Sequence, residues 1–88
     1  MKVYVVYLLG YTGSNELEIL GVYKDINSAE KRYYQEIIDN ITDFDFDYDK
    51  ECEDITTKTG KMSRLFKGGY QENWDNYIEI HIEEQEVK

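Results

Sequence analysis

The residues with the clearest chemical potential are the aspartates that alternate with aromatic residues over residues 43–49 (DFDFDYD). Carboxylates can bind metal cations, pair with basic partners or take part in acid–base chemistry. Alternation with a period of two is typical of a strand that buries its aromatic side chains and exposes its carboxylates to water. Because Asp is a poor strand former, an extended loop is the alternative for this segment.

On a strand, the four aspartates would project from one face at intervals of roughly 6.6–6.8 Å. Successive phosphates follow a nucleic-acid strand at a comparable interval, so the row could occupy a basic cleft that normally holds DNA or RNA. The alternative is a solvated acidic strand whose aromatic residues complete the core. From the first interpretation we predict these partner-binding residues: Asp43, Asp45, Asp47, Asp49, Glu51, Phe46, Tyr48 and Trp74.

The same aspartates match the first half of an EF-hand calcium loop, with Asp43, Asp45 and Asp47 at the first three ligand positions. The match then fails, because Tyr48 stands where the loop needs Gly for its sharp turn. The twelfth position, which should be a bidentate Glu, is Asp54, and no second helix is predicted to follow. The sequence therefore predicts no dedicated metal site and no cofactor.

Catalytic chemistry finds little support in the remaining reactive residues. Cys52, the single cysteine, lies between Glu51 and Glu53, and their negative field disfavours the thiolate that a nucleophile requires. His81, the single histidine, is predicted to be a surface or dimer-interface residue on a strand. We therefore expect that the protein is not an enzyme. One cysteine also allows no intrachain disulfide, which favours a reducing compartment.

The charge of the chain is strongly acidic and unevenly distributed. Nineteen acids and ten bases give a net charge of -9. Residues 42–54 hold seven acids and one base, whereas residues 55–70 hold four bases and no acid. Direct binding to nucleic acid or to an anionic membrane is disfavoured, because phosphate neutralisation requires clustered Lys and Arg. We expect the basic stretch to pair with the neighbouring acidic strand, or with the acidic row of a second copy.

Periodicity predicts the elements that must position these residues. Residues 2–10 and 16–24 predict two strands of an antiparallel hairpin, and the first is apolar on both sides, as expected of a central strand covered on both faces. Residues 26–41 predict an amphipathic helix capped by Asp25 or Asn27, with its apolar stripe widened by Tyr34 and Ile38.

The second half of the chain is less regular. A hairpin is predicted over residues 55–67 around Thr59-Gly60, with a turn at Gly68-Gly69 and a loop over residues 72–76. Residues 77–83 predict a strand with its isoleucines inward. The prediction is one α+β domain over residues 1–88: an antiparallel sheet of four to five strands in the order β-β-α-β-β(-β), with one helix packed on one face.

The first part of the chain also carries a resemblance. VYVVY at residues 3–7, the EILGVY segment at residues 18–23 and SAEK at residues 28–31 resemble a family of small uncharacterised domains from phages, prophages and bacterial mobile elements. The resemblance covers residues 3–38 and implies an N-terminal β-hairpin followed by a helix. It also implies a mobile-element origin, but it implies no mechanism.

Together these features predict a small acidic protein-binding module of the cytoplasm. Its most concrete form is a phage or mobile-element inhibitor, of the anti-defence, anti-CRISPR or DNA-mimic type, that blocks a basic nucleic-acid-binding host protein. The alternatives are a nucleotide or small-ligand binding domain that uses the basic stretch and the tyrosines, and a structural homodimer without catalytic function. The apolar run over residues 3–9 is too short to span a bilayer and lacks the flanks of a signal peptide.

Overall fold

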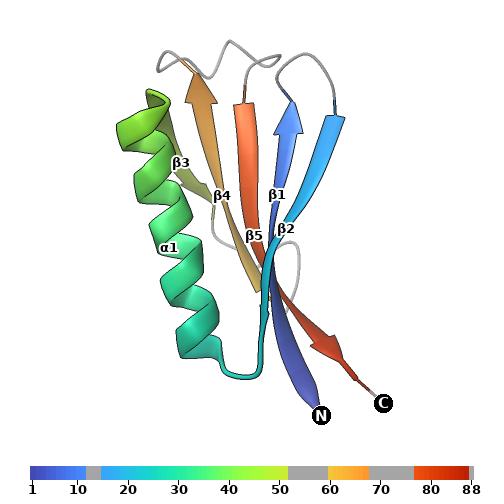
Figure 1. The fold of residues 1–88 in the computed structure, drawn as a ribbon. Coiled ribbons are helices and arrows are strands. Elements are labelled where there is room, and N and C mark those ends of the chain that lie inside the picture. Colours follow the sequence, from blue (N-terminus) through green and yellow to red (C-terminus); the bar gives the residue numbers. More distant parts are fainter. Residues whose placement is uncertain (12–14, 52–59, 68–76, 88) are drawn as a thin grey trace.

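The computed structural model describes residues 1–11, 15–51, 60–67 and 77–87, which form a five-stranded antiparallel sheet and one helix (Figure 1). The sheet order is β2-β1-β5-β4-β3. This confirms the predicted α+β class, with a single helix packed on the sheet. The elements in chain order are β1 (Lys2–Tyr11), β2 (Asn15–Tyr23), α1 (Ile26–Asp43), β3 (Phe46–Glu51), β4 (Gly60–Lys67) and β5 (Tyr77–Glu86).

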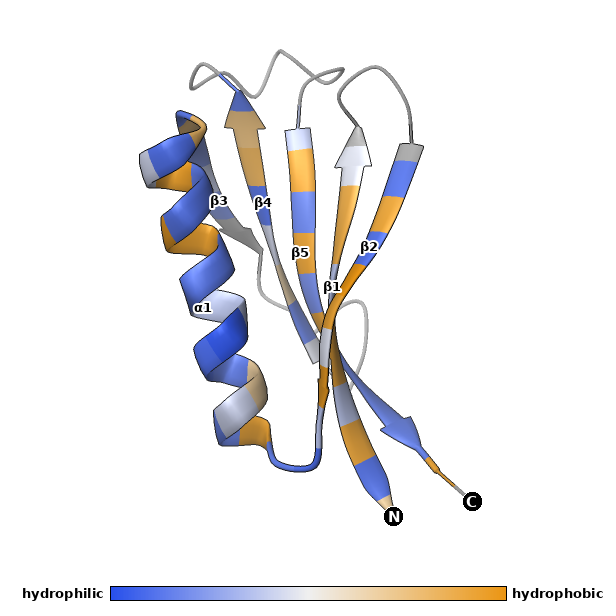
Figure 2. Ribbon diagram, viewed as in Figure 1, coloured by the Kyte–Doolittle hydropathy of each residue, from blue (hydrophilic) through white to orange (hydrophobic). Residues whose placement is uncertain are grey.

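The N-terminal hairpin forms as predicted, and the last strand pairs with it to complete one side of the sheet. β1 pairs with β2 and with β5, so it is an inner strand, as its apolar sequence indicated, and β5 is the middle strand of the sheet. In β2 the register shifts by one residue opposite Val6 and Tyr7, and Leu20 is the extra residue of this bulge. β5 places its isoleucines in the core as predicted, and Figure 2 shows its regular alternation of apolar and polar residues.

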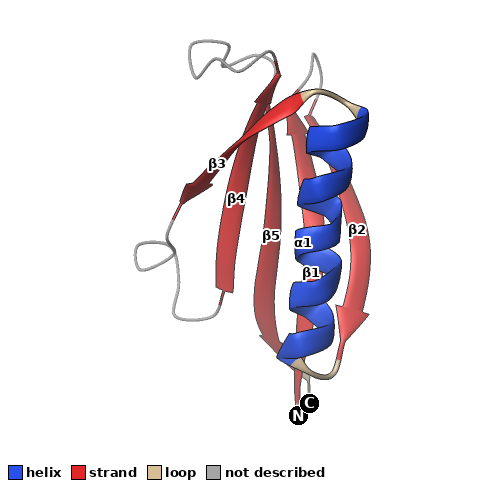
Figure 3. Cartoon of the chain, turned by 90° about the vertical axis from the view of Figure 1, so that its left-hand side faces the viewer, coloured by secondary structure: helices blue, strands red, loops and turns tan. Residues whose placement is uncertain are grey.

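Helix α1 begins at an Asp cap and crosses one face of the sheet (Figure 3). The Asp25 carboxylate accepts a hydrogen bond of 2.8 Å from the backbone N–H of Ser28, which satisfies one of the free donors of the first turn. Ala29, Tyr33 and Ile37 are buried against the strands. The predicted widening of the apolar stripe is wrong, because Tyr34 and Ile38 are 38% and 54% exposed.

The helix ends later than its periodicity indicated, and this displaces the start of the next strand. α1 continues to Asp43, and Phe44 caps it by donating its N–H to the carbonyl of Asn40. Asp45 follows with a φ of 59°, a left-handed conformation that Asp tolerates better than most residues. β3 therefore begins only at Phe46, so the strand predicted over residues 43–49 is wrong in its first half.

A buried hydrogen-bond chain ties the helix to the second half of the sheet. The hydroxyls of Tyr33 and Ser63, both fully buried, share a hydrogen bond, and Ser63 Oγ lies 3.2 Å from Tyr48 Oη. The two chain ends lie side by side, and the N–H of Val87 donates a hydrogen bond of 2.7 Å to the carbonyl of Met1. The hairpin predicted over residues 55–67 is wrong where the structure describes it, because β4 begins at Gly60 and pairs with β3 and β5. Thr59 and the turns predicted at residues 68–69 and 72–76 lie outside the described residues.

Candidate functional site

The sheet has one face that the helix does not cover. In the described parts of the chain α1 is the only helix, and it lies on one side of all five strands (Figure 3). We call the other side the open face because the helix does not cover it; its β1–β2 half is exposed, whereas Met62, Phe66 and Glu79 are buried on its other half. It consists of the odd-numbered residues 3–9, 47–49 and 77–85, the even-numbered residues 62–66, and Leu17, Ile19 and Val22. The prediction that β1 is covered on both faces is therefore wrong for this side.

The half of the open face formed by β1 and β2 is apolar and exposed. Leu17, Ile19 and Val22 are 63%, 55% and 58% exposed, although aliphatic residues of this size are usually buried. Leu17 and Ile19 line one wall of a groove of about 390 Å³. Val5 and Tyr7 of β1 also line this groove. Glu83 and Gln85 of β5 form its other margin. The groove is thus an apolar surface with a carboxylate at its edge.

The centre of the open face is a compact polar cluster around Glu79. One carboxylate oxygen of Glu79 accepts hydrogen bonds from Arg64 Nε at 3.1 Å and from its terminal nitrogen at 2.8 Å. The other oxygen lies 3.1 Å from His81 Nε2. The His81 ring stacks on Tyr7 with 4.7 Å between ring centroids and an angle of 3° between planes. The ring of Tyr77 lies beneath the Arg64 guanidinium, with 5.4 Å between the ring centroid and Arg64 Cζ.

Glu79 is buried, and its partners keep it charged. Only 8% of the residue is exposed. The hydrogen bond to His81 lowers the pKa of the Glu79 carboxyl, burial acts to raise it, and the hydrogen bonds and charge of Arg64 lower it further. The net effect is a pKa below the ordinary value. The cluster therefore presents a fixed, paired carboxylate, which is a structural feature of the face and not a free acid or base.

The predicted row of four aspartates does not form. Asp43 is the last residue of α1, Asp45 lies in the following turn, and only Asp47 and Asp49 share a strand. Both of these residues lie on the open face, as the period of two predicted. Asp49 is opposite Arg64 in the pairing of β3 with β4. The geometric basis of the nucleic-acid mimic is therefore reduced from four carboxylates on one strand to two.

The other predicted contact residues have separate locations. Phe46 is buried on the helix side as part of the core, with 7% exposure, so it cannot contact a partner directly. Tyr48 also lies on the helix side, where its hydroxyl contacts Ser63. Glu51 is the last residue of β3, and Trp74 lies outside the described residues. The aromatic residues predicted to join the aspartates therefore do not share their face where the structure describes both.

The basic stretch is engaged within the molecule. Lys61 forms an ion pair of 2.5 Å with Glu30 of the helix, and Arg64 pairs with Glu79 of β5. Lys67 donates a hydrogen bond of 2.6 Å to the carbonyl of Phe44. Internal pairing is therefore present, but Lys61 and Arg64 form these ion pairs with acids of the helix and of β5, whereas the prediction named the acidic strand. Lys58 falls outside the described residues.

Sequence reasoning missed the exposed half of the open face. The alternation of Leu17 and Ile19 with two glutamates is the expected pattern of a strand that is covered on its apolar side. The helix instead covers the side that carries the glutamates. One signal in the sequence could have revealed this surface. The first strand is apolar on both faces, but the single predicted helix can cover only one of them.

Within the described residues, no group of three or more His, Cys, Asp or Glu side chains is placed to hold a metal ion. Asp43, Asp45 and Asp47 accordingly do not converge as the first half of a calcium loop would. A search of the same residues finds no helix with the length and apolar character needed to cross a membrane. Comparison with family models, curated proteins and solved structures yields no match to this chain. The resemblance to phage-type domains stays a prediction.

Proposed function

We propose that this protein is a protein-binding module that holds its partner on the open face of the sheet. The observation that supports this most is the exposure of Leu17, Ile19 and Val22 side by side on one half of that face. Aliphatic side chains that gather in one exposed patch are typical of interaction surfaces. Leu17 and Ile19 also line the groove, whose other apolar walls are residues of β1, and this favours a partner that inserts apolar side chains.

The charge around the groove defines the second property of the partner. Among the described residues of the open face, four acids (Asp47, Asp49, Glu79 and Glu83) stand against one base, Arg64. The whole chain carries a net charge of -9. A second copy would bring the same excess of acids to the interface, which opposes self-association. The surface therefore favours a basic protein with an apolar ridge over a homodimer.

The inhibitor hypothesis is a narrower form of this proposal. It adds that the partner is a nucleic-acid-binding protein of the host, and it now depends on the carboxylates of Asp47 and Asp49. In that case duplex DNA should displace the captured partner, because both ligands would compete for one basic surface. If DNA has no effect, the partner binds through a different surface and the module is not a mimic of nucleic acid.

The proposal is tested by a pair of matched variants. Ile19→Lys places a charge in the groove, and Ile38→Lys makes the same change on the outer side of the helix, where the native residue is equally exposed (55% and 54%). A partner is captured on the wild-type protein and identified, and its affinity for each variant is then measured by titration. Burying an isoleucine side chain contributes about 1.5–3 kcal/mol, so Ile19→Lys should weaken binding roughly ten- to a hundredfold.

Ile38→Lys should leave the affinity unchanged. Both variants should keep the wild-type circular dichroism spectrum, because both positions are exposed. If Ile19→Lys binds the identified partner as tightly as wild type, the open face is not the binding surface. Sedimentation of the protein alone tests the homodimer alternative. A stable dimer at low ionic strength would indicate that a second copy occupies the open face.

A further inference from the structure

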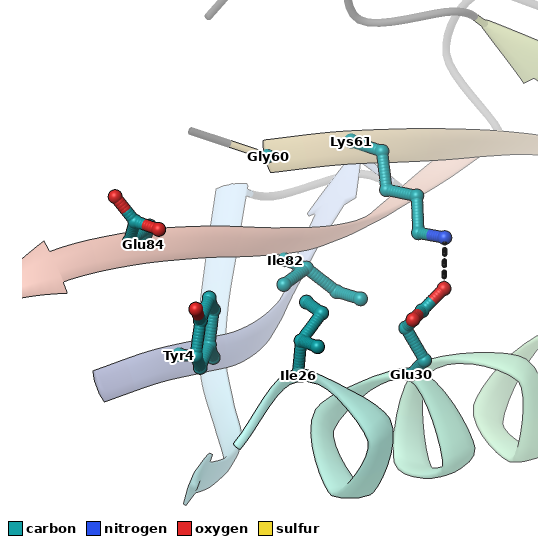
Figure 4. Close-up of a pocket in the computed structure, with 7 residues that line it drawn as sticks. All are labelled: Tyr4, Ile26, Glu30, Gly60, Lys61, Ile82 and Glu84. Atoms are coloured by element: carbon teal, nitrogen blue, oxygen red, sulfur yellow. Dashed lines mark hydrogen bonds and ion pairs between the residues drawn. The ribbon is translucent and has the colours of Figure 1, made fainter. Parts of the chain in front are cut away.

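A second concave site lies on the helix side of the sheet, away from the open face (Figure 4). It is a pocket of about 320 Å³ between the first turn of α1 and the neighbouring parts of β1, β4 and β5. Its lining consists of Tyr4, Ile26, Glu30, Lys61, Ile82 and Glu84, together with the backbone of Gly60. Its volume is at the small end of the range for ligand pockets.

One part of the pocket is apolar. The side chains of Ile26 and Ile82 approach each other between the helix and β5, and the Tyr4 ring lies beside them (Figure 4). Ile82 is a core residue with 2% exposure, whereas Ile26 is 39% exposed at the start of the helix. These three side chains offer a wall of hydrocarbon that a short aliphatic chain could cover, and its burial would release water from Ile26.

The charged groups of the pocket favour a cation. Lys61 is held by Glu30 at 2.5 Å and by the Tyr34 hydroxyl at 3.1 Å, so its ammonium is already neutralised. Burial acts to lower the pKa of Lys61, but these two hydrogen bonds raise it above the ordinary value. Glu84 stands at the other end of the pocket, and its only ion pair within the described residues is to Lys2 at 3.4 Å.

The pair between Glu84 and Lys2 is weak enough to be exchanged. The Lys2 side chain is 59% exposed, and such surface pairs contribute little to stability because water screens them. Two carboxylates and one ammonium give the lining an excess of one negative charge. An incoming cation can therefore replace Lys2 at Glu84 while its hydrocarbon part covers Ile26 and Ile82.

We propose that this pocket binds the cationic end of an aliphatic chain, with the chain against Ile26, Ile82 and Tyr4 and the charge at Glu84. Two sources share this chemistry: a free alkylamine or polyamine, and the lysine side chain of a partner protein. The proposal does not rest on the function assigned to the open face, because the pocket lies on the opposite side of the sheet.

The test is a titration of the isotope-labelled protein, followed by the amide NMR signals of the residues around the pocket. The probes are pentylamine, neutral pentanol and anionic pentanoate, which share one hydrocarbon chain and differ in charge. Saturable shifts at Ile26, Gly60 and Ile82 are expected with pentylamine, at an affinity roughly fivefold or more above that of pentanol. Pentanoate should not bind, and added salt should weaken the amine.

Two variants locate the charge. Glu84→Gln should reduce the affinity for pentylamine to that for pentanol, while Glu18→Gln, which neutralises an exposed acid on β2 away from the pocket, should not change it. Capped lysine separates the two sources: binding of the capped residue assigns the pocket to a protein side chain, and binding of pentylamine alone assigns it to a free amine. Equal affinity for pentanol and pentylamine, a preference for pentanoate, or no saturable shift would each overturn the proposal.

Discussion

Replacing Glu79 with Gln should destabilise the protein in a way that depends on pH. The substitution keeps the size of the side chain and removes its charge. The remaining amide oxygen can still accept the two hydrogen bonds from Arg64, which are 2.8 and 3.1 Å long in the native protein, but without the negative charge that strengthens them. His81 loses a charged acceptor at 3.1 Å. Because Arg64 is largely buried, with 20% of its side chain exposed, water compensates for the lost charge only in part.

The size of the effect follows from these contacts. Hydrogen bonds to a charged group contribute about 1.5–3 kcal/mol, and Asp49, which lies opposite Arg64 in the register, provides a second acid nearby. We therefore expect Glu79→Gln to lower the free energy of unfolding by about 1–3 kcal/mol at pH 7. For a domain of 88 residues, whose typical total is about 4–13 kcal/mol, this is a large share.

The pH dependence gives the prediction its sharpest form. The pKa of Glu79 in the folded protein lies below its ordinary value of 4.5, so folding favours the ionised form. Its stabilisation is complete above the ordinary pKa and is lost as the pH falls through the lowered folded value. Protonated Glu closely resembles Gln in shape and charge. The difference in stability between wild type and Glu79→Gln should therefore shrink towards acidic pH.

The measurement is urea denaturation followed by circular dichroism, at pH 7 and at steps towards about pH 3. Glu83→Gln is the matched control, since Glu83 lies four residues further along β5 on the same face and has no ion pair within the described residues. It should change the free energy of unfolding by less than about 0.5 kcal/mol. Equal losses for the two variants, or a loss from Glu79→Gln that is constant with pH, would refute the reasoning.

Two further predictions concern the packing of the sheet, and denaturant midpoints check both. Tyr33→Phe removes the hydroxyl that bonds to Ser63 in the core, which should cost about 1–2 kcal/mol; an unchanged midpoint would mean that this hydrogen bond contributes nothing. Gly60→Ala would place a Cβ in steric overlap with the carbonyl oxygen of Ile82, so the strands must separate, at a cost of about 1–3 kcal/mol. Gly10→Ala, where the nearest atoms lie at 3.9 Å, should be much milder.

Much of the fold could be predicted because most of its elements have a clear local hydrophobic periodicity. The hairpin, the helix from Ile26 and the strand from Tyr77 all occur near the expected positions, since each shows a hydrophobic pattern long enough to define its type. The prediction failed over residues 43–49, where a period of two competed with the end of a helix. The helix continued for two more residues, and Asp45 then took a left-handed turn that no alternation pattern reveals.

The candidate site was much less accessible to sequence reasoning. The members of the polar cluster are far apart in the chain, and only the pairing of β4 with β5 and of β5 with β1 brings Arg64, Glu79, His81 and Tyr7 together. Local periodicity records which residues alternate, but it does not record which of the two faces receives a helix. That choice was made by the bulge in β2 and by the packing of α1, which left Leu17 and Ile19 exposed.

By itself the sequence determined the charge, the types of element and the class of fold, because these depend on composition and on contacts between near neighbours. The tertiary structure alone decided that two aspartates, and not four, share a strand face, and that an apolar groove remains open beside Glu83. Both outcomes depend on strand register and on which side of the sheet the helix covers, and these are set by contacts between residues distant in the chain.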